Sequence, residues 1–141
     1  MTSPPTIEAW NGFVMRSDPK AYEIGTSKRS AALACMYMSG ANNGGINSFL
    51  TCTYDYDASE VLAALVAVGA LTAAREFEQV LLKLGTPLAA SSQEVRWSLL
   101  ERHWSDALDH DDVLTAEADR ELMRVLEQHV CENEAFYLTL A

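Results

Sequence analysis

The residues of this chain that could take part in chemistry are few and lie far apart. His103 and His110 have no second ligand at metal-binding spacing, so we interpret them as solvated or structural. His129 lies near the end of a predicted helix, where the helix dipole weakly favours an imidazolium. The aspartate-rich segment 109–112 suggests a calcium loop, but an EF-hand starting there needs glycine at its sixth position, where Leu114 stands. We therefore expect no metal site.

The three cysteines do not form a recognisable motif either. Cys35, Cys52 and Cys131 are odd in number, widely spaced and without a CxxC pair, so we expect three small buried side chains and no disulfide framework. The polar segment 42–45 follows a predicted helix, not a strand, and lacks the glycine spacing of a phosphate-binding loop. The sequence thus predicts no catalytic residue and no cofactor. An enzyme with a cleft near segment 42–45 remains an alternative.

The charge of the chain points to a different class of function. The net charge is −10, from 20 acidic and 10 basic residues, which argues against direct binding to nucleic acid, because phosphates demand clustered Lys and Arg. Residues 86–141 hold twelve of the acids and four of the bases. This balance permits the reverse case, in which an acidic surface occupies a protein that normally binds DNA. A solvated helix surface is the simpler interpretation.

Two features predict a cytoplasmic protein without a membrane contact. Residues 1–5 show no basic segment leading into an apolar stretch, so we expect no secretory signal. The most hydrophobic run, residues 61–74, is shorter than the roughly 20 apolar residues that a membrane span needs.

The apolar spacing predicts an all-α fold, a single compact domain over residues 1–141 with about six or seven helices and a frayed end at 1–6. The run 61–74 is apolar on nearly every side, which predicts the buried central helix, with Gly69 as its stop signal. A helix over 27–39 is expected to stop at Gly40, and a loop over 40–45 to lead into a short helix from Ile46.

Capping signals set the other predicted boundaries. Asp57 with Glu60, and Ser91 with Glu94, each have the spacing of a capping box. The second box would begin a helix that reaches about residue 109, with an apolar stripe formed by Trp97, Leu100, Trp104 and Leu108. The final long helix would begin after Thr115.

Two sequence motifs resemble a bacterial family. Asn43-Gly44-Gly45-Ile46-x-x-Phe49-Leu50 is followed by Ala63-Ala64-Leu65-x-x-Val68-Gly69-Ala70, and together they resemble the DNA-mimic-protein family of all-helical domains. The resemblance is most specific over residues 42–85. Ile46 stands where the family usually has phenylalanine, and Thr51 where an asparagine is expected. We interpret the motif as structural, with these members: Asn43, Gly44, Gly45, Ile46, Phe49, Leu50 and Gly69.

The resemblance implies a dimer whose acidic surface imitates DNA toward a transcription regulator, although most members of the family have no assigned function. We therefore predict a non-enzymatic protein-binding module that engages a basic or DNA-binding protein, and that is able to form a homodimer. An immunity or antitoxin-like protein that neutralises a toxin is the alternative. The predicted partner-binding residues are Glu94, Glu101, Asp106, Asp109, Asp111, Asp112, Glu117, Asp119 and Glu121.

Overall fold

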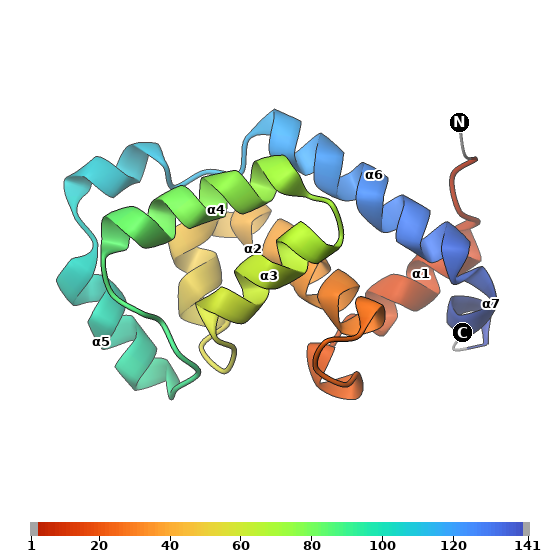
Figure 1. The fold of residues 1–141 in the computed structure, drawn as a ribbon, viewed down its shortest axis with the longest axis horizontal. Helices are drawn as coiled ribbons and strands as arrows, with labels where there is room; N and C mark the ends of the chain where they lie inside the picture. Colours follow the sequence, from red (N-terminus) through yellow and green to blue (C-terminus); the bar gives the residue numbers. More distant parts are fainter. Residues whose placement is uncertain (1–2, 140–141) are drawn as a thin grey trace.

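Helix α2, Ser27–Cys52, is the element on which most of the chain packs. In the computed structural model, which describes residues 3–139, it contacts α3, α5, α6 and the 3-10 helix η1 (Figure 1). The prediction of an all-α fold with six or seven helices is confirmed, since seven α-helices and no strand occur in that range. The other elements are α1 Ile7–Met15, η1 Pro19–Ala21, α3 Ala58–Ala67, α4 Leu71–Leu84, α5 Gln93–His103, η2 Asp106–His110, α6 Ala116–Glu132 and α7 Glu134–Leu138.

The predicted stop at Gly69 is confirmed, but the buried central helix predicted over 61–74 is wrong. The chain turns between α3 and α4 at Gly69, whose φ of +88° is a left-handed conformation that other residues rarely adopt. Val66 and Leu71, on either side of the turn, are 53% and 54% exposed. The run is apolar because two short helices meet there, and α2 takes the central place instead.

The predicted stop at Gly40 is also wrong, because α2 continues through Gly44 and changes direction at Gly45. Gly45 has φ +87° and ψ 179°, which breaks the helical hydrogen-bond ladder and sets the residues after it at an angle. Gly40 instead allows the two limbs of α2 to touch, since a Cβ there would lie 2.9 Å from a ring carbon of Phe49. The corner that the sequence predicts therefore exists, but five residues later.

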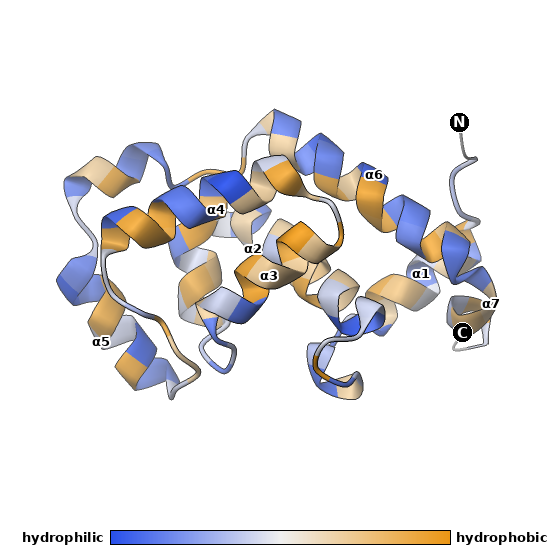
Figure 2. Cartoon of the chain, in the orientation of Figure 1, coloured by the Kyte–Doolittle hydropathy of each residue, from blue (hydrophilic) through white to orange (hydrophobic). Residues whose placement is uncertain are grey.

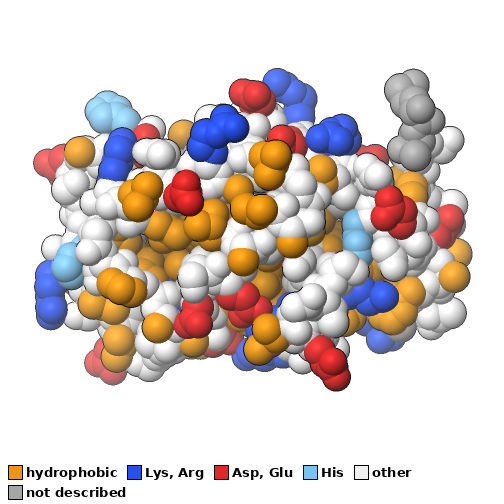
Figure 3. All heavy atoms as spheres, in the orientation of Figure 1, with side chains coloured by type: hydrophobic (Ala, Val, Ile, Leu, Met, Phe, Trp, Pro, Cys, Tyr) orange, Lys and Arg blue, Asp and Glu red, His pale blue; other side chains and the backbone are white. Residues whose placement is uncertain are grey.

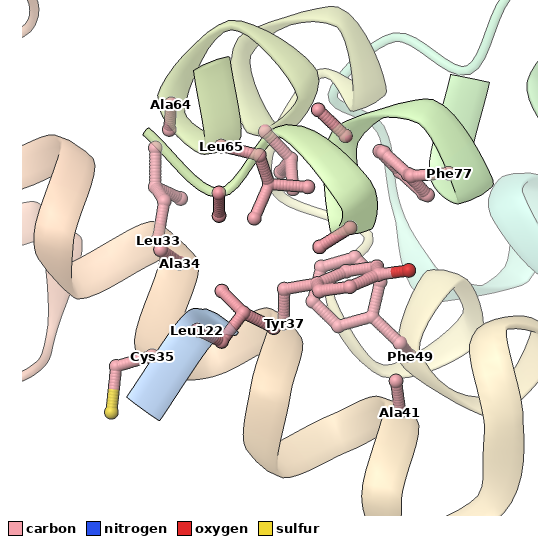
Figure 4. Packing of buried hydrophobic residues seen from close by; sticks show 14 of the residues in the cluster. Leu33, Ala34, Cys35, Tyr37, Ala41, Phe49, Ala64, Leu65, Phe77 and Leu122 are labelled. Atoms are coloured by element: carbon pink, nitrogen blue, oxygen red, sulfur yellow. The ribbon is translucent and has the colours of Figure 1, made fainter. Parts of the chain in front are cut away.

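The buried apolar residues form one cluster to which all seven helices contribute. Its centre is an aromatic triad in which Tyr37 and Phe49 of α2 meet Phe77 of α4, with ring centroids 5.0 to 5.9 Å apart and interplanar angles of 61° to 80° (Figure 4). Edge-to-face rings of this kind stabilise a core beyond their area of contact. Ile46 and Leu50 are buried in the same cluster.

Helix ends follow local capping signals, with some corrections. Thr115 caps α6 as predicted, and Gly85 closes α4 in the left-handed conformation. Ser92, not Ser91, caps α5, and Thr6 caps α1, so this part of the end predicted to fray is ordered. Asp57 precedes α3 but makes no cap hydrogen bond to it; its carboxylate accepts the Ala90 N–H instead.

Helix α5 ends at His103, earlier than predicted, and η2 follows. The predicted stripe holds for the buried Leu100 and Leu108, but Trp97 is 59% exposed. The hydropathy of α4 and α6 is one-sided, with polar residues turned away from the core (Figure 2). None of the helices in residues 3–139 has both the length and the apolar character that a bilayer crossing requires.

Candidate partner-binding surface

Two of the nine predicted partner-binding acids hold the kinked helix α2. The Asp112 carboxylate accepts the Asn47 N–H at 2.7 Å, so it caps the second limb of α2 from 65 residues away. Gly45 fits against it closely, since a Cβ at that position would lie 2.6 Å from Asp112 atoms. Asp119 of α6 accepts from the Asn42 side-chain amide at 2.9 Å. Residues in and beside the Asn43-Gly44-Gly45 motif thus contact acids far along the chain.

A third acid, Glu121, caps α4 across the interface between α4 and α6. Its carboxylate accepts the Thr72 N–H at 2.7 Å, and α4 has no cap from its own N-cap residue. The arrangement is reciprocal, because Glu76 of α4 accepts from the hydroxyl of Thr115, the N-cap of α6, at 2.6 Å. These two carboxylates place negative charge at two helix N-termini, where the helix dipole favours it.

Asp109 and Asp111 are bonded as well. Asp109 accepts the indole N–H of Trp104 at 2.9 Å, and Asp111 pairs with the Lys83 ammonium at 2.7 Å. Five of the nine predicted residues therefore have partners within the protein. For these five positions, the bonds within the protein explain why an acidic residue is present, without any external partner.

The other four predicted acids are free. Glu94 and Glu101 lie on α5, Asp106 on η2 and Glu117 in the first turn of α6, and all four are exposed. Within residues 3–139 they make no side-chain hydrogen bond or ion pair. On the face shown in Figure 3, Lys and Arg side chains lie between carboxylates along the edge formed by α4 and α6. The carboxylates on that face do not form an unbroken line.

Arg96 anchors α5 to the rest of the molecule, and the sequence analysis did not identify it as a structural residue. It is 1% exposed, and its guanidinium donates to the carbonyl oxygens of Tyr56 at 2.7 Å and Ala89 at 2.9 Å. Three further carbonyls, those of Leu50, Tyr54 and Leu88, lie at 3.2 to 3.4 Å. Burial lowers the Arg96 pKa below its ordinary value. The only sequence signal is its i, i+4 spacing to the buried Leu100.

The segment 42–45 borders a groove of about 770 Å³ between α1, η1 and α2, where the enzyme alternative expected a cleft. Its lining is mainly apolar and includes Trp10, Met36 and Phe49. Two of its reactive groups are not activated. The pKa of Lys20 is raised by its bond to Asp55, and the pKa of the Cys35 thiol is raised by burial, so both keep their protons.

The remaining histidine and cysteine predictions are partly corrected. Burial and the nearby Lys28 lower the pKa of His129, so its neutral form is favoured and not the imidazolium. Of the cysteines, only Cys35 is buried; Cys52 is exposed and Cys131 half-buried. Residues 3–139 contain no group of three or more His, Cys, Asp or Glu side chains arranged to hold a metal ion.

Comparison with known proteins gives one result. The sequence model of a family described as "DMP19-like protein" matches residues 24–139, a range that spans α2 to α7 and all nine predicted acids. Neither the curated proteins nor the solved structures contain a match to the chain.

Proposed function

Because this chain belongs to the DMP19-like protein family, the DNA-mimic family that its Asn-Gly-Gly motif resembles, we propose that it is a non-enzymatic module that binds a DNA-binding protein. The contact surface would be formed by α5, η2 and the start of α6. Its partner would present Lys and Arg residues that otherwise contact phosphates.

The observation that carries this proposal is the set of free carboxylates on these three elements. Glu94, Glu101, Asp106 and Glu117 come from three consecutive elements, and no residue of the described chain neutralises them. Exposed carboxylates that are not already paired are available for charge-assisted bonds to Lys and Arg. The five bonded acids are less suited to this role, because a partner would first have to break their contacts within the protein.

The test compares two variants with the same charge. The first neutralises the four free acids (E94Q, E101Q, D106N and E117Q), and the control neutralises four acids that lie outside the proposed surface (E8Q, E23Q, E127Q and E132Q). Each changes the net charge from −10 to −6. Immobilised protein would be incubated with the heparin-binding fraction of a lysate of the source organism. We expect capture by the native chain and the control, release by high salt or duplex DNA, and loss of capture in the first variant.

Capture that resists both salt and duplex DNA would overturn mimicry, since a surface that imitates DNA must compete with it. If the resistant partner is a toxic enzyme whose activity the chain blocks, the immunity or antitoxin-like alternative gains support. A cytoplasmic location and a homodimer remain predictions. The mass of the purified protein in solution, against 15.5 kDa for one chain, tests the homodimer.

A further inference from the structure

A second groove of about 520 Å³ lies between α3 and α4 and is closed at one end by segment 85–89. The two helices run side by side, and the surface between α4 and the elements below it is hollowed and lined with hydrophobic side chains (Figures 1 and 3). Leu62 of α3 and Leu81 and Leu82 of α4 supply apolar walls. Leu82 is 67% exposed, so much of its apolar surface is not covered by the described chain.

The charges of this groove have one sign. Asp57 and Glu78 are the charged residues that line it, and no Lys or Arg does so. The Asp57 carboxylate already accepts the Ala90 N–H, whereas the exposed Glu78 carboxylate has no bond within residues 3–139. An apolar floor with an acidic rim is complementary to an apolar segment flanked by Lys or Arg.

We infer that this groove binds one amphipathic helix of a basic protein partner, with the apolar side of that helix against Leu62, Leu81 and Leu82 and a Lys or Arg beside Glu78. A pair of adjacent helices presents ridges and a furrow into which a third helix packs, and such grooves bind helices by anchors at i, i+3, i+4 and i+7. A second copy of this chain is the poorer occupant, because each copy carries a net charge of −10.

This inference rests on the proposed function, because it names a second contact for the same kind of partner. Segment 85–89 leads directly to Ser92, the cap of α5, and to the free acid Glu94. A partner that reaches both places would be steered by the free carboxylates and held by apolar burial in the groove. Burial then decides how long it stays bound, while charge mainly affects how fast it arrives.

The probe is a synthetic 18-residue peptide with leucines at helical i, i+3, i+4 and i+7 spacing and lysines elsewhere. A scrambled peptide of the same composition serves as its control. Binding would be measured by fluorescence anisotropy and located on the isotope-labelled chain by amide chemical shifts. We expect amide shifts at Leu62, Leu81, Leu82 and Ala89. The L82S variant should bind the peptide about tenfold more weakly, because it loses the apolar side chain that the peptide would cover.

The matched control is L71S, which changes another exposed leucine of α4 that lies outside the groove. L71S should bind like the native chain, and E78Q should bind about threefold more weakly at low salt only. Both leucines are largely exposed, so neither variant should unfold the protein.

Three results would overturn the inference: equal binding by L82S and the native chain, equal binding of the scrambled peptide, or conversion of a dimer to a monomer by L82S. The last would assign this face to contact between copies. The outcome is separable from that of the proposed function. The variant without the four free acids should still bind the peptide in the groove, even where it no longer captures a DNA-binding protein.

Discussion

The α5–η2 end and the α1–α7 end of the molecule are attached to its centre by opposite means. At the first end, the buried cation Arg96 donates to backbone carbonyls, and the anion Asp112 accepts a backbone N–H of α2. At the second end, aromatic rings make the contact: Phe13 of α1 and Tyr137 of α7 meet edge to face with centroids 5.3 Å apart. His129 of α6 completes this group through a 2.7 Å bond to the Tyr137 hydroxyl.

The difference affects how each end can carry exposed charge. The Arg96 guanidinium lies among five backbone carbonyls and donates to them, so the anchor of α5 is polar and the outer surface of this helix is free for charged residues. The aromatic end depends on buried apolar area, which charged residues would weaken. An acidic recognition surface is therefore easier to build at the first end, and the following predictions test that contrast.

The largest effect should come from Arg96→Met, which keeps the apolar stem and removes every hydrogen bond of the guanidinium. We expect a loss of about 3 kcal/mol or more in the free energy of unfolding, because several buried carbonyls would lose their donor. Urea denaturation measures it. Arg102→Met is the control, since it removes an exposed cation from the same helix; an equal loss there would contradict the anchoring role.

Gly45→Ala should cost about 2–4 kcal/mol, because alanine would adopt a glycine conformation and its Cβ would collide with Asp112. Gly25→Ala separates the two causes. Gly25 has the same φ of +87° but open space around it, so its cost should be about 1 kcal/mol. If both variants lose equal stability in thermal unfolding, the contact between the kink and Asp112 contributes nothing.

Asp112 and Arg96 also mark how far the sequence could predict the fold. Several signals that act within a few residues were reliable: Thr115 begins α6 and Gly85 ends α4 where predicted, and the apolar positions of α4 face the core. Others failed, since α2 continues past Gly40 and the caps predicted at Asp57 and Ser91 do not form. Contacts over long separations were invisible. Nothing near Asp112 indicates that it caps a helix 65 residues earlier, and nothing near Arg96 indicates that five carbonyls surround it.

The same limit explains why the predicted binding site included acids that are bonded within the protein. A count of acids after Gly85 located the excess charge, but it could not separate acids used as caps from acids left free, because that distinction depends on packing. The stop at Gly40 failed for a related reason. Glycine there allows the close approach of Phe49 and does not end the helix.

A pair of aspartates tests the division between bonded and free acids directly. Asp112→Ala should lower the free energy of unfolding by about 1–2 kcal/mol, the usual cost of a lost helix cap. Asp106→Ala should change it by less than about 0.5 kcal/mol, because its carboxylate is exposed and unbonded. Both variants remove one negative charge. Equal effects in urea denaturation would mean that the two classes of acid do not differ.

The smallest effect is expected at the aromatic end, as a dependence of stability on pH. Burial and Lys28 lower the pKa of His129 below 6.5, while Glu132 opposes them in part. The unfolded chain therefore binds a proton at higher pH than the folded chain. The stability that neutral His129 contributes is complete above about pH 6.5 and is lost as pH falls through the folded pKa.

The physical cause is local: an imidazolium beside Lys28, in a half-buried site, would be poorly solvated while α7 stays packed through Tyr137. Urea denaturation between pH 7.5 and 5 measures the effect, with His129→Gln as the variant that should flatten it. If the slope persists in His129→Gln, the acid-sensitive group lies outside the aromatic end, and the contrast between a polar and an aromatic end fails.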